Sequence, residues 1–182
     1  MTDTTAPPPR LLGVLFLGTL LAALDIAIVG PALPALREAF ALTERAVAWT
    51  FTAFVLANLA GLPVMAALAD RVGRKRVYLA DIAVFAAGTL VVVLAPSFGV
   101  LLAGRVLQGI GASGIFPVAT AVIGDTYPPE RRGRAVGMLG AVFGVAFLVG
   151  PAVGGIVLSF ASWRVLFALS LPLAAVVFGL SA

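Results

Sequence analysis

Six long apolar segments, separated by short polar breaks, constrain the fold of this chain more than any other feature. As a helix rising 1.5 Å per residue, the first segment would span roughly 39 Å, enough to cross a bilayer core of about 30 Å. Backbone groups in lipid must be hydrogen-bonded internally, and the segments are too long and too uniformly apolar for barrel strands. We therefore predict an all-α membrane protein with a six-helix transmembrane domain over 11–182, its helices at 11–36, 46–69, 77–94, 98–124, 135–160 and 163–182.

The composition supports the membrane interpretation and excludes several classes of function. Hydrophobic residues make up 62% of the chain and charged residues 11%, against about half and a quarter in soluble domains. There is no Cys and no His, which argues against thiol chemistry, a metal site and imidazole catalysis. We expect no enzyme activity, no cofactor and no metal. The net charge of +4 does not predict a nucleic-acid partner, because the basic residues sit at the ends of apolar segments.

The distribution of Lys and Arg between the polar breaks predicts the orientation in the membrane. One side carries eight of them, namely Arg10, Arg71, Arg74, Lys75, Arg76, Arg131, Arg132 and Arg134. The other side carries three, Arg37, Arg45 and Arg164. Basic residues accumulate on the cytoplasmic side, so residues 1–10 form a predicted cytoplasmic tail and both termini are cytoplasmic. We expect the chain to lie in the cell (inner) membrane, in contact with its lipids.

Two ionisable residues, Asp25 and Arg105, are expected deep in the bilayer. Each costs about 2.5–3.5 kcal/mol at a helix centre, so a function is the default hypothesis. Counted along their helices, Asp25 lies roughly 9 Å and Arg105 roughly 10 Å from the outer boundary, which allows an ion pair. Such a pair can simply neutralise itself. Alternatively it titrates, because burial favours the neutral carboxyl whereas a nearby guanidinium favours the carboxylate. A change in their separation would then load or release a proton.

Other polar residues in the spans and breaks give weaker signals. Asn58 and Gln108 are placed in a cavity, although polar side chains in membrane helices often only join neighbouring helices. The cytoplasmic breaks repeat a pattern of an acid, Arg, Gly and Arg, at 70–74 and again at 130–134. Attraction to anionic lipid explains the arginines but not the recurring acid and glycine. Glycine in these breaks would permit a tight turn between helices.

Four motifs, in order along the chain, resemble those of the major facilitator superfamily and of its drug/proton antiporters in particular. They are Leu24–Pro34 in the first span, Ala66–Lys75 between the second and third, Arg105–Ala112 in the fourth and Gly150–Gly155 in the fifth. Trp163, Arg164 and Phe167 also fit the start of the sixth span. The chain departs from the usual motifs at Gly30, Ala66 and Ala146.

The resemblance implies roles for the residues that match these motifs. Asp25 and Arg105 become the candidates for proton coupling. The cytoplasmic breaks would form a conformational latch made of Asp70, Arg71, Gly73, Arg74, Arg131 and Arg134. The fifth-span motif would supply antiporter packing through Gly150, Pro151, Gly154 and Gly155. The fold would be half of a major facilitator, built as two inverted three-helix repeats.

The resemblance also makes the chain short for a complete transporter, and three interpretations remain open. In the first, a half-size exporter works as a parallel homodimer, with Asp70 of one copy facing residues 131–134 of the other. It would expel drug-like hydrophobic or cationic small molecules in exchange for protons, by alternating access. In the second, the chain is an N-terminal fragment that needs a second half. In the third, it is a non-transporting membrane subunit, which would tolerate neutral replacements of Asp25 and Arg105.

Overall fold

The computed structural model of the protein describes residues 9–182, so most of the predicted tail at 1–10 lies outside the described residues. All regular elements in this range are helices. They are α1 (Pro9–Ala39), α2 (Glu44–Val47), α3 (Trp49–Val72), α4 (Arg74–Val93), α5 (Phe98–Ser113), α6 (Ile115–Thr126), α7 (Pro129–Phe160), α8 (Trp163–Ala168) and α9 (Ser170–Ser181).

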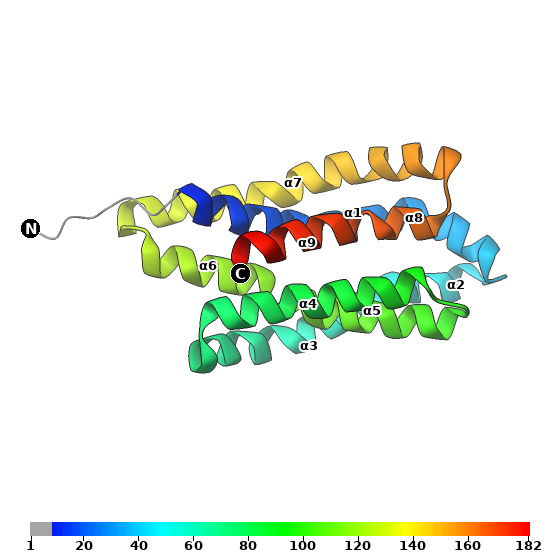
Figure 1. The fold of residues 1–182 in the computed structure, drawn as a ribbon. Coiled ribbons are helices and arrows are strands. Elements are labelled where there is room, and N and C mark those ends of the chain that lie inside the picture. Colours follow the sequence, from blue (N-terminus) through cyan, green and yellow to red (C-terminus); the bar gives the residue numbers. More distant parts are fainter. Residues whose placement is uncertain (1–8) are drawn as a thin grey trace, which may run out of the picture.

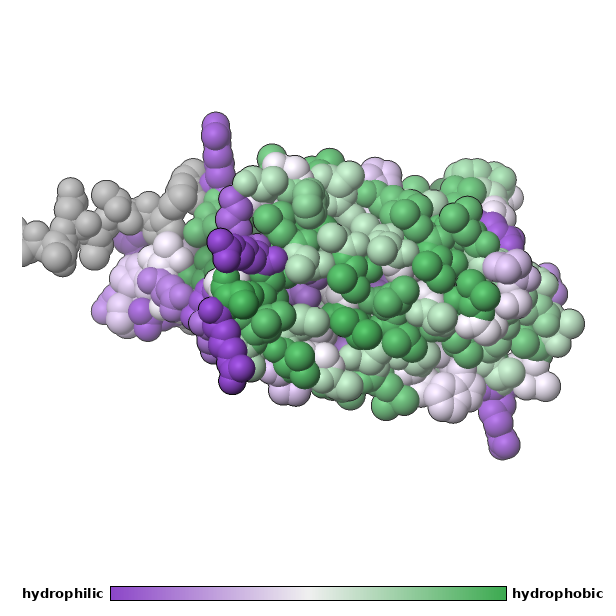
Figure 2. Space-filling model, turned by 60° about the horizontal axis from the view of Figure 1, so that its bottom comes forward, coloured by the Kyte–Doolittle hydropathy of each residue, from purple (hydrophilic) through white to green (hydrophobic). Residues whose placement is uncertain are grey.

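These helices form six segments long and apolar enough to cross a membrane within the described residues, and they run back and forth along one axis (Figure 1). The predicted all-helical, six-span fold is confirmed. The beginning of α1, the α3–α4 turn, the α6–α7 turn and the end of α9 lie at one end of the bundle (Figure 1). On the face drawn in Figure 2, apolar side chains form a broad band, with hydrophilic side chains gathered at its two ends.

Three of the six spans consist of two helices each, meeting at Ala48, Gly114 and Leu169. Proline explains two of these breaks, because its nitrogen cannot donate the helical hydrogen bond to the carbonyl four residues earlier. Pro117 leaves the carbonyl of Ser113 without that donor, next to the break at Gly114. Pro172 does the same for Ala168, next to the break at Leu169. We have no physical account of the break at Ala48.

The two motif segments that are predicted to be cytoplasmic adopt different conformations. Gly73 alone separates α3 from α4 and has a φ of +100°, a conformation that glycine adopts without strain. The expected tight turn at Gly133 is wrong, since Glu130–Arg134 forms the first turns of α7. The chain begins this helix at Pro129, and proline is favoured at the first helical position. Glu130 adds a negative charge to the first turn, where the helix dipole favours it.

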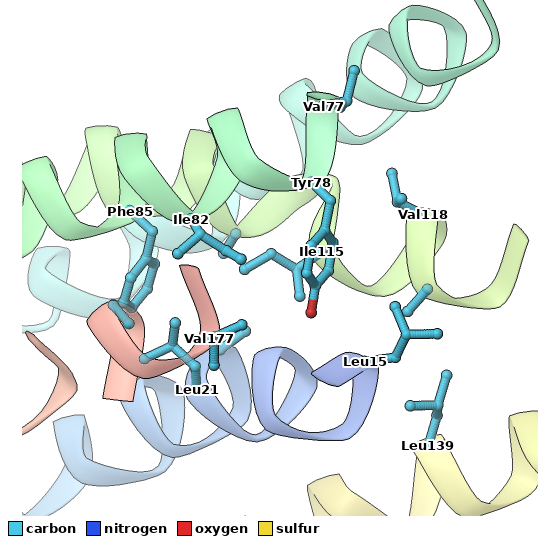
Figure 3. Close-up of a cluster of buried hydrophobic side chains, with 14 of the residues drawn as sticks. Leu15, Leu21, Val77, Tyr78, Ile82, Phe85, Ile115, Val118, Leu139 and Val177 are labelled. Carbon is cyan, nitrogen blue, oxygen red and sulfur yellow. The ribbon is translucent and has the colours of Figure 1, made fainter. Parts of the chain in front are cut away.

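Two apolar clusters fill the interior of the bundle. Around one of them, Tyr78, Ile82 and Phe85 of α4 face Leu15 and Leu21 of α1 (Figure 3). The other cluster, around Leu36 and Trp163, lies toward the end of the bundle away from the α3–α4 turn. Glycines bring α4 and α5 close together: a β-carbon on Gly111 would come within 2.3 Å of the backbone nitrogen of Phe85. Small residues permit such approaches between membrane helices.

Candidate functional site

A buried ion pair joins α1 to α5 between the two apolar clusters. An Arg105 Nη1 hydrogen is donated to Asp25 Oδ2 over 2.6 Å, and both side chains are completely buried. The structure thus brings together the two residues that the sequence placed at equal depth. Charge-assisted hydrogen bonds of this length are among the stronger ones in proteins. The geometry alone suits both a neutralised pair and a proton-exchanging one.

Arg105 also contacts two other helices, α3 and α8. Its Nε donates to the carbonyl oxygen of Thr50 on α3 over 3.0 Å. Its guanidinium carbon lies 4.4 Å from the ring centre of Phe54 on α3 and 5.7 Å from that of Phe167 on α8. Aromatic faces attract cations at these distances. The buried Nη2 has no hydrogen-bond partner among the described residues.

Gln108 completes the cluster by bridging α5, α1 and α4. Its Oε1 accepts from Arg105 Nη1 over 2.7 Å, and its Nε2 donates to Asp25 Oδ1 over 3.1 Å. The same Nε2 donates to Thr89 Oγ1 over 2.9 Å. Thr89 in turn donates to the carbonyl of Phe85. The sequence predicted Gln108 in a cavity, whereas in the structure its side chain is fully buried within the charge cluster. Thr89 was not predicted to belong to the site.

The local sequence explains why these groups converge. Arg105 and Gln108 are three residues apart and therefore share one face of α5. Gly104 lies against Val92 of α4, and Gly109 lies against the Phe54 carbonyl of α3. Larger residues at either position would separate the helices that carry the partners. Asn58 of α3 was also predicted to lie in a cavity. Its Nδ2 donates a hydrogen bond to the carbonyl of Gly109 over 3.3 Å, which joins α3 to α5.

A second charged network lies at the end of the bundle where α3 meets α4. Arg74 Nε donates to Asp125 Oδ2 over 3.0 Å, and Arg74 Nη2 lies 3.9 Å from Asp70 Oδ1. Asp125 was not predicted to belong to this network. It could have been, because it is an acidic residue at the end of an apolar segment, next to the basic residues 131–134. Arg71, Arg131 and Arg134 are exposed. Their predicted contacts across an interface stay a prediction.

The four residues of the fifth-span motif divide into two pairs. A β-carbon on Gly150 would come within 2.4 Å of the Ala27 methyl, and one on Gly154 within 2.7 Å of the Pro31 ring. Pro151 and Gly155 are exposed, on a different face of α7. The two buried glycines thus let α7 pack directly on the first-span motif of α1.

Asp81 of α4 is a further ionisable residue inside the bundle, in addition to Asp25 and Arg105. Its side chain is buried, with 2% of the residue exposed. Sequence reasoning passed over it because the surrounding run still reads as apolar. Within residues 9–182, no group of three or more His, Cys, Asp or Glu side chains comes close enough to hold a metal ion.

A sequence profile described as the Major Facilitator Superfamily matches residues 15–182. The chain belongs to the Major Facilitator Superfamily. Its members are transporters rather than enzymes. Multidrug resistance protein 3 of Bacillus subtilis (strain 168) is 35% identical over 161 residues, which are 88% of this chain and 31% of that protein. Efflux pump dotC of Dothistroma septosporum (strain NZE10 / CBS 128990) is 39% identical over 166 residues, 91% of this chain and 28% of the pump.

Solved transporters show the same fold over half of their length. The xylose transporter XylE from E. coli, in a partially occluded inward-open conformation, superposes with a TM-score of 0.84 at 16% identity, over 94% of this chain and 47% of that one. The human organic anion transporter MFSD10 superposes with a TM-score of 0.80 at 24% identity, over 96% of this chain and 47% of that one. This superfamily chain therefore spans about a third of its curated relatives and about half of these transporters.

Proposed function

We propose that this chain is one six-helix half of a proton-coupled efflux transporter and operates with a second six-helix half. The observation that carries the proposal is the buried Asp25–Arg105 pair, with Gln108 bonded to both partners. A stable fold gains little from such a pair compared with apolar residues. Its presence is accounted for if the carboxyl exchanges partners, taking a proton when Arg105 withdraws.

The direction and the class of substrate are proposed from the relatives. Multidrug resistance protein 3 and Efflux pump dotC both resemble this chain over about nine-tenths of its length. We therefore assign it drug-like hydrophobic or cationic small molecules, exported in exchange for protons by alternating access. Gly150 and Gly154, seated on α1, provide the close packing on which one helix can rock against another. Both ends are assigned to the cytoplasm by the positive-inside rule.

A second half supplied by further sequence or by another polypeptide accounts for the comparisons better than a homodimer does. The match to this chain covers 47% of each of the two solved transporters. We assign the interface with the second half to α3, because the span Glu44–Val72 is the least buried of the six described spans, at 6%. Exposed apolar side chains along it include Phe51, Leu56, Leu59 and Val64. In this arrangement Asp70 would meet basic groups of the second half, and residues 131–134 would meet its acidic ones.

The test measures substrate-dependent proton movement in vesicles that contain this chain with and without a second six-helix half. We expect movement only with the second half, and its loss in Asp25→Asn. A stable dimer of the chain that transports alone would establish the homodimer instead. Transport that survives Asp25→Asn and Arg105→Leu would refute the coupling role. Absence of movement in every combination, with assembly intact, would identify a non-transporting subunit.

A further inference from the structure

Asp81 is a buried carboxyl that the proposed mechanism does not use. It lies about two turns into α4, roughly 10 Å from the helix start at Arg74. Its Oδ2 has no hydrogen-bond partner among the described residues. An ionised carboxylate without a partner is too costly to keep in an apolar interior, and such a group takes up a proton instead. The carboxyl must therefore be neutral here or gain a partner in another conformation.

The carboxyl of Asp81 is pressed against the break between α5 and α6. A β-carbon on Gly114 would come within 2.0 Å of Asp81 Oδ2 and within 3.0 Å of the Met65 β-carbon on α3. Gly114 has an ordinary φ of −93°, so the space, not the backbone conformation, requires glycine there. Beside it, Pro117 leaves the carbonyl of Ser113 without its helical donor. A protonated carboxyl, unlike a carboxylate, can donate a hydrogen bond to a carbonyl.

The helices packed around this part of α4 bring it no balancing charge. Helix α9 has no ionisable residue. The ionisable residue of α5 is Arg105, engaged with Asp25, and that of α6 is Asp125, at its far end and paired with Arg74. On α3 they are Asp70 and Arg71, in its last turn. On α4 itself Arg74, Lys75 and Arg76 lie in the first turn, where Arg74 pairs with Asp125 and Lys75 donates to the carbonyl of Ala182. Tyr78, one turn before Asp81, donates its hydroxyl to the carbonyl of Val14. Arg164 of α8 donates to the carbonyl of Ala95, beyond the other end of α4.

Asp81 also lies in line with the charge cluster. Residues 81, 85 and 89 follow one another at four-residue spacing on one face of α4, and Thr89 is the partner of Gln108. The separation along the helix is roughly 12 Å. Phe85, packed against Gly111, stands between the two polar sites. Asp81 is therefore a separate site on the side of the cluster nearer to the α3–α4 turn.

We propose that Asp81 is a second proton-binding site, protonated in this conformation, which exchanges its proton with the cytoplasmic side when α5 and α6 change their angle at Gly114. The cytoplasmic assignment of that side, and any use of the proton in transport, rest on the proposed function. The occupancy of the site by a proton does not. It can be measured on the resting protein without substrate or a second half.

Infrared spectroscopy of the full chain in lipid vesicles tests the occupancy at neutral pH. We expect a C=O stretching band of a protonated carboxyl that is lost in Asp81→Asn and kept in Asp25→Asn, the matched control. Selective carbon-13 labelling of Asp should shift the band in the unmodified protein, which keeps the test valid if Asp81→Asn does not fold. If the unmodified protein shows no isotope-sensitive band of this kind, Asp81 is ionised and the proposal fails.

The exchange step has its own measurement. In heavy water the band should shift at the rate at which the break opens. Pro117→Ala restores the missing hydrogen bond to Ser113 and should slow that shift, whereas Pro34→Ala, in α1, should not. Equal rates in the unmodified protein and Pro117→Ala would overturn the role of the break. Transport that survives Asp25→Asn, with the Asp81 band present, would overturn the proposed function and leave this proposal standing. Absence of the band, with transport lost in Asp25→Asn, would do the reverse.

Discussion

Gly150 of α7 lies so close to Ala27 of α1 that a β-carbon at position 150 would come within 2.4 Å of the Ala27 methyl. The obstacle is a methyl on a helix backbone, which has no rotamer by which to move away. One turn later, Gly154 meets Pro31 in the same way. These contacts fix the distance between two helices that both carry superfamily motifs.

Gly150→Val should therefore separate α1 from α7 and destabilise the bundle. Overpacking of a close contact costs typically about 1–3 kcal/mol. The measurement is the midpoint of thermal unfolding in a mild detergent. Gly155→Val is the matched control, because a β-carbon there meets nothing within 4 Å. Equal midpoints for the two variants would show that the contact is not tight in the membrane.

Arg105→Leu should destabilise the protein more than the double variant Asp25→Asn with Arg105→Leu. The single change leaves the fully buried carboxylate of Asp25 without its cation, and breaking a buried pair from one side costs about 3–5 kcal/mol. The double change removes both charges. Comparison of the unfolding midpoints of the single and double variants checks this. A single variant as stable as the double one would mean that Asp25 finds another partner or a proton.

Arg105→Lys should keep the charge but lose most of the cluster. One guanidinium spans Asp25, Gln108 and the Thr50 carbonyl through two different nitrogens, and an ammonium presents its donors from one point. We expect proton-coupled transport to fall strongly in the assembled transporter, while folding is largely retained. Substrate binding measured separately from transport distinguishes a lost coupling from a lost fold. Full coupling in Arg105→Lys would reduce the role of Arg105 to its charge.

Gly73→Ala should strain the turn between α3 and α4. Gly73 has a φ of +100° and a ψ of 138°, a region that is costly for residues with a β-carbon, by about 1–3 kcal/mol. Nothing lies within 4 Å of a β-carbon there, so backbone strain is the dominant effect. Gly137→Ala, which also meets nothing within 4 Å but is helical, serves as the control and should be neutral or slightly stabilising. The measurement is again the unfolding midpoint.

Asp125→Asn should weaken the hold on Arg74 at the end of the bundle where α3 meets α4. Arg74 Nε lies 3.0 Å from the Asp125 carboxylate, while its distance to Asp70 is 3.9 Å. Because the Asp125 side chain is 62% exposed, the effect on stability should be small, below about 1 kcal/mol. A spin label or fluorophore near the α3–α4 turn should report greater mobility. Asp70→Asn, the more distant partner, should change it less.

Much of the site could be predicted from the sequence, because the position of a residue along a helix follows from the number of residues before it and the rise per residue. The equal depth of Asp25 and Arg105 follows from the residues between each of them and a span boundary. Gln108 could be anticipated near Arg105 because three residues separate them on a helix. The proton-coupling role given to the pair, and the latch role given to Asp70, Arg71, Gly73, Arg74, Arg131 and Arg134, stay predictions.

The sequence by itself determined six membrane-spanning helices, because long apolar runs in lipid leave the backbone few ways to satisfy its hydrogen bonds. It did not determine how each helix is rotated or which helices touch. Tertiary structure decided that Gly150 and Gly154 face α1, while Pro151 and Gly155 do not. It also decided that Arg74 reaches Asp125, and that Asp81 lies against Gly114. These contacts depend on side-chain packing between helices distant in sequence, which the hydropathy of a single segment does not encode.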